Sequence, residues 1–187
     1  QMNGKSDQSL AVMRKLAITY PKDRDVLAAY GKALAANGQF EPALDAVRRA
    51  QTPEYPDWKL LSAEGAILDQ LGQAAEARNL YRKALDLKPN EPSVISNLGM
   101  SYVLEGDLKT AETYMRTAAS QPGADSRVRQ NLALVVGLQG RFDEAEKIAG
   151  QELSPEQAQA NVTYLRSMLA QQNAWNQLKD EEKPGTN

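Results

Sequence analysis

Glycine recurs along this chain at a constant interval of 34 residues, and this interval is the feature that most restricts the fold. The first series comprises Gly4, Gly38, Gly72, Gly106 and Gly140. A second series comprises Gly31, Gly65 and Gly99 and continues with another small residue, Ala133. A fixed interval of this length predicts copies of one structural unit that stack along the chain.

One complete copy of the unit runs from Pro92 to Gly123, and Gly106 divides it into two apolar stripes with helical spacing. At Gly106 we expect the chain to leave a helix in the left-handed conformation, which costs a residue with a β-carbon about 1–2 kcal/mol. A 34-residue unit of two helices is typical of the tetratricopeptide repeat. The sequence therefore predicts an all-α solenoid of antiparallel helix pairs, wound as a right-handed superhelix of nine to ten helices.

The same interval divides the chain into a single solenoid over residues 1–172. Residues 4–23 are expected to be a half repeat, whose helix from Asp7 to Tyr20 lacks a first helix to pack against. The complete repeats are expected at 24–57, 58–91, 92–125 and 126–153, followed by a capping helix at 154–172 and a polar, disordered tail at 173–187. Ser154 and Gln157 form a capping box at the start of the last helix.

The half repeat leaves an apolar face uncovered. We expect an upstream segment that is missing from this sequence, or a second copy in a homodimer, to cover that face.

Composition argues against several classes of function. The chain has no His, no Cys and a net charge of −2, so the usual general base, thiolate nucleophile and zinc ligands are missing. We therefore predict no catalytic residue, no metal and no cofactor. A net negative charge also disfavours nucleic acid as a partner.

The remaining candidate site is the concave surface that the first helices of stacked repeats form. Its first half is expected to be small and mixed in charge, and its second half to have an apolar floor beside Asn97 and Asn131, which could bind a peptide backbone. The alternative is that the last helix folds back over this floor and buries it as core. The predicted partner-binding residues are Lys59, Ser62, Asp69, Ser93, Ser96, Asn97, Met100, Val103, Leu104, Arg127, Gln130, Asn131, Leu134 and Leu138.

Three stretches, residues 56–72, 90–102 and 126–169, resemble the TadD-type assembly proteins of tight-adherence (Flp) pili. The most distinctive are RQNLALVVGLQGRF and SPEQAQANVTYLRSML. The resemblance implies a periplasmic lipoprotein anchored in the outer membrane by an N-terminal lipid. It also implies a pilotin-like adaptor that helps the pilus secretin, or a protein associated with it, to assemble. The sequence departs from the family pattern because it has neither a signal peptide nor a lipidated Cys.

A cytosolic adaptor of another multiprotein complex is the alternative. The carboxylate clamp of cochaperone tetratricopeptide domains is not predicted, because Ala28 and Lys32 stand where its leading Lys and Asn would be.

Overall fold

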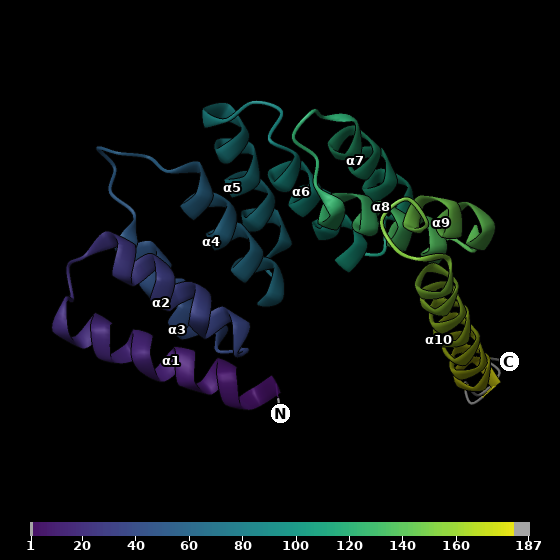
Figure 1. The fold of residues 1–187 in the computed structure, drawn as a ribbon, viewed down its shortest axis with the longest axis horizontal. Helices are drawn as coiled ribbons and strands as arrows, with labels where there is room; N and C mark the ends of the chain where they lie inside the picture. Colours follow the sequence, from purple (N-terminus) through teal and green to yellow (C-terminus); the bar gives the residue numbers. More distant parts are fainter. Residues whose placement is uncertain (1, 182–187) are drawn as a thin grey trace, which may run out of the picture.

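The computed structural model describes residues 2–181, and this part of the chain contains ten α-helices and no strand (Figure 1). The predicted all-α solenoid is therefore confirmed. The helices are α1 (Met2–Thr19), α2 (Arg24–Ala36), α3 (Phe40–Ala50), α4 (Trp58–Gln70), α5 (Ala74–Leu87), α6 (Pro92–Leu104), α7 (Leu108–Ser120), α8 (Ser126–Leu138), α9 (Phe142–Ala149) and α10 (Pro155–Glu181).

The helices stack in pairs along an arch (Figure 1). Each of α2, α4, α6 and α8 packs against the helix that follows it, and these four first helices also contact one another in sequence order. Figure 1 shows α5 and α7 on the outer side of the arch, with α1 and α10 at its two ends. The first helices therefore form one continuous inner surface.

Four tight turns connect the helices of each pair. Gly38, Gly72, Gly106 and Gly140 have φ angles of +76° to +85°, which only glycine adopts without strain. Gly4 does not share this conformation, although it lies on the same 34-residue interval. It lies inside α1, where a Cβ atom would meet open space to 4 Å, because no preceding helix of the described chain has to end at this point.

Short polar side chains fix where the helices begin. Asp23, Asp57, Asp107 and Asp125 each accept a hydrogen bond from a backbone N–H of the first turn that follows. The predicted capping box is confirmed, since the Ser154 N–H donates to Gln157 Oε1 at 3.3 Å and the Gln157 N–H donates to Ser154 Oγ at 3.2 Å. Among the first helices, α6 differs, because Glu91 before it makes no side-chain cap hydrogen bond.

The last helix is longer than the sequence suggested. It continues to Glu181, whereas residues from 173 were expected to form a disordered polar tail. The polar composition misled that prediction, because the stretch from Glu156 to Lys183 contains no Gly or Pro and is rich in good helix formers. Residues 182–187 of the expected tail lie outside the described part. Among residues 2–181, no helix combines the length and the apolar character needed to cross a bilayer.

Candidate protein-binding groove

The inner surface carries a charged hollow at its N-terminal end. It has a volume of about 830 Å³ and lies between the loop before α2, α2 itself and the start of α4. Asp23 and Asp57 are occupied as helix caps. Arg24 is also occupied, donating from Nε to the Ala50 carbonyl at 3.0 Å. The remaining charged side chains in the lining are Lys22, Asp25, Lys32 and Lys59.

Two predicted groove serines are buried, which corrects the sequence interpretation. Ser62 is 6% exposed and Ser96 is 3% exposed. Asn97 Nδ2 donates to Ser62 Oγ and Asn131 Nδ2 donates to Ser96 Oγ, both at 3.0 Å. Each of the two side-chain amides predicted to bind a peptide backbone therefore donates one hydrogen bond to the preceding repeat. We call these two bonds the Asn–Ser ladder.

Asp69 also points into a hydrogen-bond network within the solenoid. Its two carboxylate oxygens accept hydrogen bonds of 2.8 Å from Tyr81 Oη and from Ser101 Oγ. Burial raises the pKa of Asp69, and the two hydrogen bonds oppose that shift. Arg78 donates to Ser101 at 3.3 Å and lies with its guanidinium 4.7 Å from the Tyr102 ring centre. Asp69 therefore joins two repeats and is not a free groove charge.

The predicted apolar floor is partly open. Met100 and Val103 are half-buried and pack against the core cluster that contains Leu132 and Val136. Leu104 is 56% exposed at the end of α6, whereas Leu138 is half-buried at the end of α8. The floor thus presents one fully accessible leucine beside partly covered neighbours.

The last helix stands beside the C-terminal end of this floor. A Cβ atom at Gly137 would lie 3.0 Å from Leu165 Cδ1, so α10 approaches α8 closely there. Between α8, α9 and α10 is a hollow of about 450 Å³ whose lining includes Gln130, Asn131 and Leu134. The helix therefore covers the floor near Gly137 and leaves Leu104 uncovered.

Four predicted polar residues lie on the exposed surface of the first helices. Lys59, Ser93 and Arg127 are exposed, and Ser93 Oγ donates to Glu91 Oε1 at 3.0 Å. Gln130 is exposed as well and donates to Ser126 Oγ at 3.0 Å. Of these, Lys59 and Arg127 are the cations that a partner could reach.

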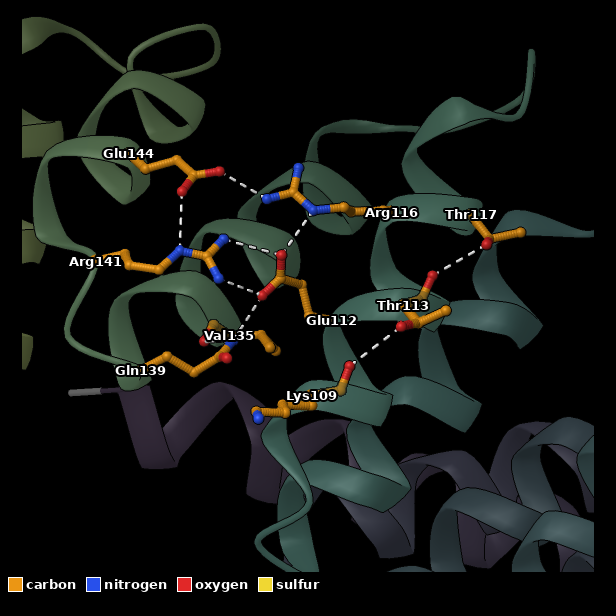
Figure 2. A network of polar contacts seen from close by, with 9 residues as sticks. All are labelled: Lys109, Glu112, Thr113, Arg116, Thr117, Val135, Gln139, Arg141 and Glu144. Carbon is orange, nitrogen blue, oxygen red and sulfur yellow. Dashed lines mark hydrogen bonds and ion pairs between the residues drawn. The ribbon is translucent and has the colours of Figure 1, made fainter.

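A second polar network joins α7 to the fourth repeat (Figure 2). The two Glu112 oxygens accept hydrogen bonds of 2.7 and 2.9 Å from the two terminal nitrogens of Arg141. Arg116 donates to Glu112 at 2.7 Å and to Glu144 at 2.7 Å. The hydrogen bonds from Arg141 are the largest cause that lowers the pKa of Glu112, from 4.5 to about 2.

A third polar contact explains an irregular position in the repeat. Glu64 is 8% exposed at a place where the other repeats carry a large apolar residue. It accepts hydrogen bonds from Arg48 Nε at 2.9 Å and from Gln51 Nε2. In the sequence, only the basic side chain of Arg48, 16 positions before Glu64, indicated a partner for this buried carboxylate.

Two family models of the tetratricopeptide repeat match the chain, one over residues 3–58 and one over residues 70–135. The chain is a tetratricopeptide-repeat protein. Among curated relatives, it is 28% identical over 130 residues to cellulose synthase operon protein C of Pseudomonas fluorescens, covering 63% of this chain. It is 25% identical over 146 residues to the TPR repeat-containing protein YpiA of Bacillus subtilis, covering 76% of this chain.

The chain spans only a small part of those relatives, 10% of the Pseudomonas protein and 34% of YpiA. Among solved structures, a thermophilic TPR protein of Thermus thermophilus aligns with a TM-score of 0.70 at 21% identity, over 88% of this chain and 92% of that one. MamA aligns with a TM-score of 0.59 at 19% identity, over 86% of this chain and 94% of that one. These structural likenesses support the tetratricopeptide fold, which is typical of protein-binding scaffolds without catalytic activity.

Proposed function

We propose that this tetratricopeptide-repeat protein is a non-catalytic adaptor that binds a segment of a partner protein along its inner surface. The observation that carries the proposal is that the C-terminal half of the solenoid has both an exposed leucine, Leu104 at the end of α6, and a separate hollow of about 450 Å³ beside α10. Concave, mostly apolar surfaces with a few polar groups are the usual binding sites of soluble proteins.

The charges of the groove define the chemistry of the partner. Four bases, Lys22, Arg24, Lys32 and Lys59, line the N-terminal hollow with three acids, Asp23, Asp25 and Asp57, and Arg127 is exposed farther along. This part of the inner surface therefore has a small excess of positive charge on a molecule with a net charge of −2. A segment that combines acidic residues with an apolar anchor complements it.

The partner that we propose is the pilus secretin or an associated assembly protein of the tight-adherence pilus. The support is the resemblance of residues 56–72, 90–102 and 126–169 to the TadD-type assembly proteins. On this proposal the full-length protein acts as a pilotin-like adaptor in the periplasm, held at the outer membrane by an N-terminal lipid. An adaptor of another multiprotein complex, in the cytosol, is the second candidate, because curated relatives include a BBSome complex member, BBS4, at 25% identity over 123 residues.

The experiment is a binding titration of this chain against purified periplasmic segments of the pilus secretin. We expect Leu104→Asp with Lys59→Glu to weaken binding at least tenfold, because one change removes the apolar contact and the other reverses a groove charge. Leu87→Asp is the matched control, since Leu87 is 44% exposed at the end of α5, on the outer side of the arch. Equal loss with the control would place the contact elsewhere, and no binding by the native chain would contradict the secretin assignment.

A further inference from the structure

One side of α1 exposes apolar side chains, and comparison with the equivalent positions of α3 shows which contacts α1 does not make. In α3, the positions that pack against the first helix of the same repeat are no more than 2% exposed. They are Ala43, Ala46, Val47 and Ala50. The positions 34 residues earlier, in α1, are Ser9, Val12, Met13 and Leu16.

These α1 positions are exposed or only half-buried. Val12 is 58% exposed and Leu16 is 36% exposed, and Tyr20, one helical turn beyond Leu16, is 54% exposed. In α5 and α7, the counterparts of Met13 (Tyr81 and Met115) and of Leu16 (Ala84 and Ala118) are at most 1% exposed. The counterparts of Val12 (Leu80 and Tyr114) are half-buried. By its position in the repeat, α1 is therefore a second helix. Within the described chain, no first helix covers its exposed side. We call Val12, Leu16 and Tyr20 the α1 face.

The other end of the arch has an uncovered helix of the complementary kind. In chain order α10 is a first helix, and no second helix follows it within the described residues. Tyr164 on its outer side is 67% exposed, in a shallow hollow of about 470 Å³ that α10 alone lines, with Glu156, Ala160 and Thr163. Ala160, one helical turn before Tyr164, is exposed as well. We call Ala160 and Tyr164 the α10 face.

Charge distinguishes the two ends. The α1 helix carries three basic residues, Lys5, Arg14 and Lys15, against one acid, Asp7. At the opposite end, the two hollows on α9 and α10 are lined by three acids, Asp143, Glu146 and Glu156, and by one base, Lys147. Arg166 is a second exposed base on α10, and its guanidinium lies 4.6 Å from the Phe142 ring centre. No ion pair joins these charged side chains to another side chain that the structure describes.

We propose that copies of this chain associate head to tail, with the α1 face of one copy packed against the α10 face of the next. The α10 helix then supplies the first helix that α1 lacks, so the stacking of helix pairs continues from one molecule into another. Opposite charges favour this contact, whereas pairing α1 with α1 would bring two basic helices together. A head-to-tail contact is heterologous, and it builds an open chain or a closed ring of copies.

The test uses two variants that each remove one face of the 187-residue chain. Val12→Asp with Leu16→Asp removes the α1 face, and Ala160→Arg with Tyr164→Arg removes the α10 face and reverses its charge. The measurement is molar mass by light scattering and sedimentation velocity over a hundredfold range of concentration, with helix content and melting temperature as checks on folding.

We expect the native chain to grow in mass with concentration and each variant alone to remain a monomer. An equimolar mixture of the two variants should form a dimer and nothing larger, because one intact face of each kind remains. High salt should weaken the association, since the Debye length shrinks to about 3 Å at 1 M. Ile18→Asp is the matched control: Ile18 is 75% exposed on the other side of α1, and this change should leave the association intact.

Three results would overturn the proposal. A native chain that stays monomeric would exclude self-association through either face. An α10-face variant that still dimerises would indicate pairing of α1 with α1. A mixture of folded variants that remains monomeric would show that the two faces do not bind each other. Each of these outcomes can be observed without any groove partner, so the failure of this inference is separable from failure of the adaptor function.

Discussion

The Glu112 carboxylate is the centre of the polar network between α7 and the fourth repeat. Its carboxylate accepts hydrogen bonds from Arg141, Arg116 and Gln139 and links α7 to the fourth repeat (Figure 2). We expect Glu112→Gln to lower the free energy of unfolding at neutral pH by about 1 kcal/mol, because the arginines are partly exposed and the solvent screens them. Chemical denaturation of both proteins checks this value.

The same residue predicts a pH dependence. The pKa of Glu112 is lowered to about 2 in the folded protein from 4.5, so the stability it contributes is present above pH 4.5 and is lost as the pH falls toward 2. The stability difference between the native chain and Glu112→Gln should therefore shrink over that range. Glu54→Gln, at an exposed loop residue, should show no such convergence. A difference that stays constant down to pH 2 would contradict this role of Glu112.

Individual residues also mark the limit of prediction from sequence. Leu104 is exposed at the end of α6, and its role in binding a partner stays a prediction. Ser62 and Ser96 were expected on the same surface but are buried. The interval gives each residue its position in the repeat, but depth depends on how closely the neighbouring repeat packs, and one repeat alone does not contain that information.

At the scale of helices, the close approach of α4 and α5 depends on Gly65. A Cβ atom there would lie 2.6 Å from Tyr81 Cε1, and the Tyr81 hydroxyl is held by Asp69 at 2.8 Å. Since the ring cannot move away, Gly65→Ala should lower the free energy of unfolding by about 1–3 kcal/mol. Thermal and denaturant unfolding measure the loss.

Gly4 provides the control, because it lies within α1 with open space around its Cβ position. Gly4→Ala should leave stability unchanged or raise it by up to about 1 kcal/mol. Tyr81→Leu, which removes the aromatic ring, should reduce the cost of Gly65→Ala in the double variant. An equal cost in both backgrounds would show that the ring is not the obstacle.

Most helices could be predicted because their apolar spacing and glycine turns repeat four times. The two ends were harder. The first helix was expected to begin at Asp7 but begins at Met2, and α10 runs nine residues beyond the predicted boundary at 172. End helices have fewer neighbours, so local propensity has to set their limits, and the repeat pattern gives no constraint there.

At the scale of the whole molecule, contacts join only neighbouring helices along the arch. Leu34 is 1% exposed in a cluster with Leu10, Leu27 and Leu60, whereas Met115 belongs to a separate cluster with Leu132. Leu34→Ala should therefore speed backbone hydrogen exchange at least tenfold in α1–α3 and change it less than twofold in α7–α9. Mass spectrometry of exchanged peptides resolves the two regions.

Met115→Ala is the matched substitution in the C-terminal cluster. It should speed hydrogen exchange in α7–α9 and change it little in α1–α3. Similar acceleration over the whole arch in both variants would mean that the solenoid unfolds as one cooperative unit. Independent ends would instead allow the N-terminal repeats to open while the groove beside α10 stays formed.

The Asn–Ser ladder has a consequence for how such a chain can lengthen. The unit 92–125 carries both halves of the bond, since Ser96 accepts from the following repeat and Asn97 donates to the preceding one. A tandem duplication of this unit would recreate both bonds at each new seam and leave no buried amide or hydroxyl without a partner. The first repeat has Ala28 at the serine position and the second has Ala63 at the asparagine position, so a copy inserted between them would break that continuity. Growth of the gene by whole repeats is thus chemically permitted in the middle of the solenoid and penalised near its start.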